Sequence, residues 1–141
     1  MIYTQTILKY LQIKPETALP DISALSPFRS AIVIDELVTS DWQSQVSTWL
    51  VKSGCLYMMA WGQNCSSWDD SVDEANIEEF SNMEIPDEKF VMTTWHENET
   101  LKNAFWFSKN NAIHPTVRIS NTLILHISNK NNEKELLSLY A

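Results

Sequence analysis

Residues 31–62, AIVIDELVTSDWQSQVSTWLVKSGCLYMMAWG, contain two apolar runs separated by a helical pattern. The first run, residues 31–34, is unbroken and rich in β-branched side chains, and the second spans residues 55–61. Strands that are buried on both faces have this continuous apolar character, whereas strands with one wet face alternate. The stretch therefore predicts two buried strands.

A helix is predicted between these strands. Ser40 can cap its N-terminus, with Gln43 three residues later, and Gly54 stands where a helix-ending glycine belongs. One stripe of the helix carries the apolar side chains of Trp42, Val46, Trp49 and Leu50.

The alternation of strand and helix continues along the chain. Residues 90–95 and 121–127 predict two more strands, and helices are expected from Ser67, over residues 101–109 and from Asn132 onward. Because no hairpin signal separates the strands, we expect parallel pairing through right-handed crossovers. The predicted fold is α/β, a three-layer sandwich of flavodoxin-like or Rossmann-like type, with a four-stranded, mainly parallel sheet in the order 2-1-3-4.

The first 30 residues are expected to form an N-terminal arm. Residues 2–12 place Tyr3, Ile7, Leu8 and Leu11 at helical spacing, and three prolines follow by residue 27. The predicted organisation is an arm, residues 1–30, before a single α/β domain, residues 31–141.

Composition excludes several classes of protein. With 44% hydrophobic and 20% charged residues, the 141-residue chain is neither disordered nor collagenous. Its apolar runs are too short to cross a bilayer, and its N-terminus lacks the apolar core of a secretory signal. Two cysteines fit a reducing compartment, so we expect a cytoplasmic protein.

Charge is distributed unevenly. The net charge is −8, and the 36 residues from Ser53 to Glu88 contain no Lys or Arg but half of the 18 carboxylates. Such a field repels nucleic acid and anionic lipid but attracts a basic protein surface. The first functional hypothesis is an acidic protein-binding domain, of immunity or accessory-subunit type, that binds through Asp69, Asp70, Asp73, Glu74, Glu78 and Trp106. A solvated acidic helix remains the alternative.

Open parallel sheets bind ligands beyond the carboxyl ends of their strands. The predicted strands bring three candidate catalytic residues to that edge: His96 as acid or base, Asp35 to orient it, and Cys65 as nucleophile. A ligand pocket is predicted from Glu36, Trp61, Gln63, Asn64, Trp68, Trp95 and Glu97. The second hypothesis is therefore a small-molecule hydrolase or sensor.

Each candidate also has a structural explanation. His96 equally fits a helix-entry histidine bonded to backbone or to Asp35, and nearby Asp69 and Asp70 disfavour a Cys65 thiolate. The run HENE at 96–99 lacks the second histidine of a zinc-protease motif, and the two glycines form no nucleotide-binding loop. No metal or cofactor is expected.

Three segments resemble a small bacterial family of unknown function: VSTWLVKSGCLYMMAWG at 46–62, WDDSVDEAN at 68–76 and MTTWHENETL at 92–101. The resemblance covers roughly residues 31–128. It implies a bacterial cytosolic origin, and no activity, ligand or residue role comes with it.

Overall fold

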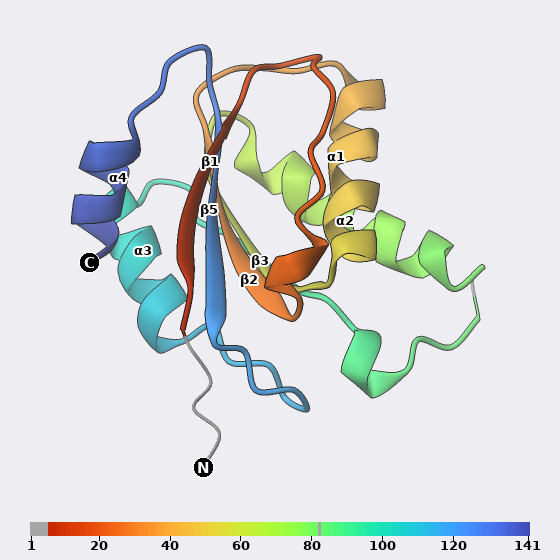
Figure 1. The fold of residues 1–141 in the computed structure, drawn as a ribbon. Helices are drawn as coiled ribbons and strands as arrows, with labels where there is room; N and C mark the ends of the chain where they lie inside the picture. The colour runs from red at the N-terminus through yellow and green to blue at the C-terminus, as the bar shows by residue number, and fades with distance from the viewer. Residues whose placement is uncertain (1–5, 82) are drawn as a thin grey trace.

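The computed structural model describes residues 6–81 and 83–141, which form a parallel β-sheet between two pairs of helices (Figure 1). Along the chain the elements are β1 (Leu8–Ile13), η1 (Ser23–Leu25), β2 (Phe28–Ile34), α1 (Ser40–Ser53), β3 (Cys55–Gly62), α2 (Cys65–Glu79), η2 (Asp87–Lys89), β4 (Met92–Trp95), α3 (Leu101–Asn110), β5 (Asn121–Ile127) and α4 (Glu133–Tyr140).

The sheet is apolar on both faces, which explains its unbroken hydrophobic strands. Successive residues of a strand point to opposite faces. Along β2, Ile32 and Ile34 pack in the core beneath α1 and α2, whereas Ala31 and Val33 pack in the core beneath α3 and α4. The α/β class and the parallel sheet are thus confirmed.

The number and order of the strands differ from the prediction. The sheet has five strands in the order β1-β5-β2-β3-β4, and every neighbouring pair is parallel. Helix α3 crosses the face opposite to α1 and α2, and this returns the chain to the free edge of β2. Right-handed crossovers on opposite faces run in opposite directions across a sheet, so β5 lies beside β2 rather than beyond β4.

The fifth strand comes from the predicted arm. Residues 8–12, expected to be helical, lie in β1, which pairs with β5 along its whole length; residues 2–5 of that predicted helix lie outside the described residues. The side chain of Tyr10 enters one core and that of Ile13 the other. Pairing with β5 and packing against both cores therefore override the helical spacing.

The other four predicted helices are present, with small shifts at some of their starts. The Thr39 hydroxyl, not that of Ser40, accepts from the backbone N–H of Trp42 and caps α1. Gly54 ends α1 with φ +103°, as expected. Helix α2 begins at Cys65, two residues before Ser67, and Thr100 caps α3 instead of Asn98. None of the helices within residues 6–81 and 83–141 combines the length and apolar character of a bilayer-crossing segment.

Candidate functional site

The carboxyl ends of β2 and β5 lie side by side at the point where the chain reverses direction across the sheet. The loop after β2 leads to α1 on one face, and the loop after β5 leads to α4 on the other. Diverging loops of this kind create the usual ligand-binding crevice of open α/β sheets. Asp35 directly follows β2, and His126 is the penultimate residue of β5.

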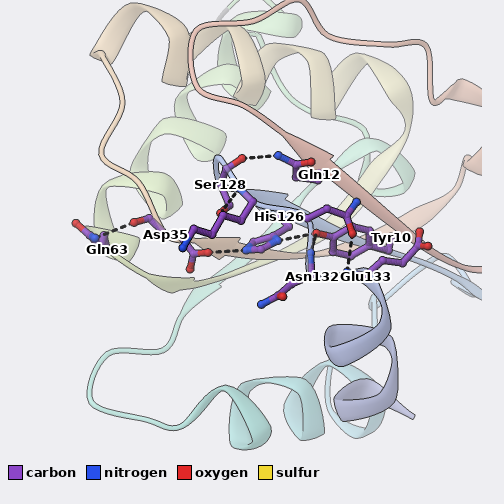
Figure 2. A network of polar contacts seen from close by, with 10 residues as sticks. Tyr10, Gln12, Asp35, Gln63, His126, Ser128, Asn132 and Glu133 are labelled. Atoms are coloured by element: carbon purple, nitrogen blue, oxygen red, sulfur yellow. Dashed lines mark hydrogen bonds and ion pairs between the residues drawn. The ribbon is translucent and has the colours of Figure 1, made fainter.

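A chain of hydrogen bonds joins these two residues to β1 and α4 (Figure 2). The Oδ2 atom of Asp35 lies 2.6 Å from Nε2 of His126, and Nδ1 of His126 lies 2.7 Å from the hydroxyl of Tyr10. The backbone N–H of Asn132, which immediately precedes α4, donates to the same hydroxyl at 2.9 Å. Four segments that are distant in sequence therefore converge on one polar network.

One assignment of donors gives every group in this chain a partner. The Tyr10 oxygen accepts from the Asn132 N–H, which can only donate, and the Tyr10 O–H donates to Nδ1 of His126. The proton of a neutral imidazole then sits on Nε2 and donates to Asp35. Every hydrogen-bonding atom of His126 is satisfied in this neutral form.

Burial differs sharply along the network. Tyr10 and His126 are buried, whereas the Asp35 side chain is 44% exposed. Burial raises the pKa of the Tyr10 phenol, the Asn132 N–H acts to lower it, and the negative charges of Glu133 and Asp35 raise it further. The phenol stays protonated at neutral pH, and of the three side chains Tyr10, His126 and Asp35 only the Asp35 carboxylate faces solvent.

Asp35 is paired with His126 and does not orient His96 in the way that the sequence analysis predicted. The His96 ring is buried against Phe107, with 4.8 Å between ring centroids. Its Nδ1 lies 2.9 Å from Oε2 of Glu99, and its Nε2 lies 3.0 Å from the Thr94 hydroxyl. Both ring nitrogens are therefore bonded to side chains close in sequence, which supports a structural role for His96 but not the predicted bond to backbone or to Asp35.

Cys65 has the surroundings of an inert thiol. It is the first residue of α2 and is buried in the core. Burial raises the pKa of its thiol, the backbone N–H of His96 acts to lower it, and the charge of Glu97 raises it again. Nucleophilic cysteines have lowered pKa values, so this environment favours a packing role.

The residues predicted to line one pocket are in fact dispersed. Trp68 is wholly inside the core beneath α1 and α2, which corrects its assignment to the pocket. The Trp61 indole N–H donates to the backbone oxygen of Glu99, whereas Trp95 is half exposed on the edge strand β4. The remaining predicted lining residues keep some exposure at or near the carboxyl edge: Glu36, Gln63, Asn64 and Glu97.

Five well-formed cavities lie away from these candidate residues. They have volumes of about 400–610 Å³, and none of the five is lined by Asp35, Cys65 or His96. Within residues 6–81 and 83–141, no group of three or more His, Cys, Asp or Glu side chains is arranged to hold a metal ion.

The carboxylates of α2 form the second candidate site. Asp70, Glu74 and Glu78 are exposed and follow one another at intervals of four residues, so they form one stripe along the helix. We call these three residues the α2 acidic stripe. Beyond α2, further exposed carboxylates follow at Glu84, Asp87 and Glu88.

Three residues of the predicted partner surface need correction. Asp69 is 7% exposed and faces inward, and the Asp73 carboxylate accepts a hydrogen bond from the Thr93 hydroxyl at 2.7 Å. Burial raises the pKa of Asp73, and the nearby charges of Asp69 and Asp70 add to that effect, while the Thr93 hydrogen bond opposes it. Trp106 is exposed, but it belongs to α3 on the opposite side of the sheet. One flat partner surface cannot cover Trp106 and the α2 acidic stripe together.

One protein family, the Domain of unknown function (DUF7684), matches residues 8–141. The chain belongs to this family. The match begins at β1, so the DUF7684 domain includes the strand that the sequence analysis placed in an arm, and the resemblance to a family of unknown function is confirmed. No curated protein and no solved structure matches the chain.

We call the hydrogen-bonded side chains of Tyr10, His126 and Asp35 the rim network of this DUF7684 domain. Sequence reasoning missed two of these three side chains. Tyr10 falls within the helix predicted over residues 2–12, and His126 falls within the strand predicted over residues 121–127, where it has no assigned role. The available signal was a histidine inside an otherwise apolar run, because a buried imidazole needs a partner for each of its ring nitrogens.

Proposed function

We propose that this DUF7684 domain is an acidic protein-binding domain that engages a basic surface of its partner, as an immunity protein or accessory subunit does. The observation that carries the proposal is the α2 acidic stripe, three exposed carboxylates in i, i+4 register within a segment that has no Lys or Arg. Two free, buried cysteines support a reducing, cytosolic setting for this activity.

The stripe acts against the stability of its own helix. Like charges four residues apart destabilise a helix by about 0.2–0.5 kcal/mol per pair. Carboxylates near a helix C-terminus also oppose the helix dipole, and the last turn of α2 has Glu78 and Glu79 but no basic residue. Lys52 of α1 pairs with Glu79 at 2.9 Å and leaves the stripe itself without a described counter-ion. Cationic side chains of a partner would relieve this repulsion.

Exposed apolar side chains accompany the acids. Ile77 on α2 is 46% exposed, and beyond the helix Met83 and Phe90 are 75% and 44% exposed. In Figure 1 the end of α2 and the segment leading to η2 project at the lower right, away from the sheet. Apolar contacts within a charged border are the usual composition of a protein interface.

The test is affinity capture from a lysate of the source cells with two charge-matched variants. The stripe variant is Asp70→Asn/Glu74→Gln/Glu78→Gln. The control variant, Asp41→Asn/Glu97→Gln/Glu135→Gln, removes three exposed carboxylates from other elements. Both change the net charge from −8 to −5, so a general loss of charge affects them equally.

A partner should be retained by wild type and by the control variant but lost by the stripe variant, and its retention should fall as salt concentration rises. Identical partners for all three proteins would refute the proposal. Equal loss with both variants would reduce it to unspecific attraction by net charge.

A second candidate function is a small-molecule sensor or hydrolase at the carboxyl edge of the sheet. It is supported by the half-exposed Asp35 carboxylate that His126 holds in place.

A further inference from the structure

The site with the most defined chemistry outside the α2 acidic stripe is the exposed end of the rim network. Asp35 uses Oδ2 to accept from His126, while its second oxygen, Oδ1, has no hydrogen-bond partner within residues 6–81 and 83–141. With the side chain 44% exposed, that oxygen is open to a ligand.

The network behind Asp35 fixes where the free oxygen points. A carboxylate on a mobile loop would rotate freely, but here it is tied to an imidazole that is 2% exposed and is itself held by Tyr10. The Tyr10 oxygen is anchored in turn by the backbone N–H of Asn132. Such a supporting shell holds a ligand-binding atom in one orientation before the ligand arrives.

A second acceptor lies beside Asp35. The side-chain amide of Gln63 donates from Nε2 to the backbone oxygen of Asp35 at 2.8 Å, and Figure 2 shows the two residues next to each other. Because its NH₂ group is used in this way, Gln63 has its carbonyl oxygen left to accept. The exposed rim at this point therefore offers oxygen acceptors and one negative charge.

The chemistry of the ligand follows from these acceptors. An anion or phosphate is disfavoured by Asp35, and Glu133 adds a second negative charge close enough to raise the pKa of Tyr10. An ammonium or guanidinium group supplies the opposite charge and several N–H donors at once. The loops after β2 and β5 diverge to opposite faces of the sheet here, which is the position where open parallel sheets bind small ligands.

We propose that the rim between β2 and β5 binds a small organic cation, whose ammonium or guanidinium group contacts Asp35 Oδ1 and the side-chain oxygen of Gln63. His126 and Tyr10 are positioning residues, which act through Asp35 without touching the ligand. This site is independent of the protein-binding proposal, because it uses no residue of the α2 acidic stripe.

The test is a titration of the ¹⁵N-labelled full chain, followed by amide NMR shifts, with three cationic probes: agmatine, putrescine and guanidinium chloride. The neutral diol 1,4-butanediol matches putrescine in length, and NaCl at equal ionic strength controls for salt. Saturable shifts are expected with the cations only, at the amides of Asp35, Gln63 and His126. Absence of saturable shifts with every cation, or the same shifts with the diol or NaCl, would overturn the proposal.

Variants assign the contact. Asp35→Asn keeps an acceptor for His126 and should raise the dissociation constant of the cations at least tenfold. Asp41→Asn also removes one charge but should leave the dissociation constant within twofold of the wild-type value. Tyr10→Phe should weaken binding three- to tenfold and alter the tautomer of His126 in imidazole ¹⁵N spectra. Binding to Asp35→Asn as tight as to wild type would overturn the site. The stripe variant should bind the cations normally, so failure here and failure of the protein-binding proposal are separate results.

Discussion

Asp35 and His126 are 91 residues apart in sequence, yet their side chains share a hydrogen bond of 2.6 Å at the carboxyl edge of the sheet. The contact exists because β5 inserts between β1 and β2, so that Val33 of β2 is the register partner of His126. Tyr10 reaches the other side of the same imidazole from β1. The insertion of one strand thus brings a buried histidine against an exposed carboxylate that is distant in sequence, whereas the buried His96 meets its exposed carboxylate, Glu99, only three residues further along the chain.

Removal of the Tyr10 hydroxyl should destabilise the fold. Tyr10→Phe leaves Nδ1 of His126 without its donor and the Asn132 N–H without its acceptor. Unsatisfied buried polar groups cost about 1–3 kcal/mol, so denaturant unfolding should show a loss of that size. Tyr57→Phe is the matched control, since Tyr57 is equally buried but its hydroxyl makes no hydrogen bond to the described residues. Equal effects of the two substitutions would contradict the structural role of the network.

Neutralisation of Asp73 should stabilise the protein at neutral pH. Burial raises the pKa of this carboxyl above the ordinary value of about 3.9, so the folded state binds the proton more tightly than the unfolded state. The stability that this group contributes is therefore present at acid pH and is lost as pH rises through the folded pKa. Asp73→Asn keeps an acceptor for Thr93 and removes repulsion from Asp69 and Asp70.

Removal of the repulsion from Asp69 and Asp70 should raise the free energy of unfolding at pH 7 by roughly 0.4–1 kcal/mol, from about 0.2–0.5 kcal/mol for each pair. Thermal melts over a pH series should show the gain vanish below about pH 4, where both carboxyl and amide are neutral. Asp41→Asn is a control of opposite sign, because Asp41 lies in the first turn of α1, where negative charge is favourable. A gain from Asp73→Asn that does not depend on pH would refute the explanation.

Gly54 should not tolerate a side chain. Its φ of +103° is a left-handed conformation, and an added Cβ would lie 2.1 Å from Oγ of Ser26. Backbone strain of about 1–2 kcal/mol and overpacking of about 1–3 kcal/mol predict a combined loss of roughly 2–5 kcal/mol for Gly54→Ala. The double variant Ser26→Gly/Gly54→Ala removes the clash and should recover only that part of the loss in urea unfolding. Full recovery would mean that backbone strain contributes nothing.

Both thiols should be unreactive in the folded protein. Burial raises the pKa of Cys55 to about 12, and it also raises the pKa of Cys65. Since the thiolate is the reactive form, a thiol-specific chromogenic disulfide at pH 8 should modify neither residue until guanidinium unfolds the chain. Rapid modification of Cys65 in the native state, with Cys55 protected, would restore the hypothesis that Cys65 is a nucleophile.

Local patterns predicted the elements of this fold well, but only where burial and periodicity agree. The apolar run at residues 31–34 lies in a strand buried on both faces, and the stripe of α1 and its terminal Gly54 were also predicted correctly. Residues 8–12 belong to a segment with helical spacing, and pairing with β5 makes them a strand instead. That pairing depends on residues 121–127, far outside any local window.

The sequence by itself determined the α/β class, the limits of most helices and the uneven charge of residues 53–88, because these depend on side-chain type and short-range spacing. Only the tertiary structure decided that β5 lies between β1 and β2, and with it the meeting of Tyr10, His126 and Asp35. Strand order is fixed by the face on which each helix packs. The tertiary structure also buries Asp69 and separates Trp106 from the α2 acidic stripe, since exposure depends on which elements pack together and not on residue type.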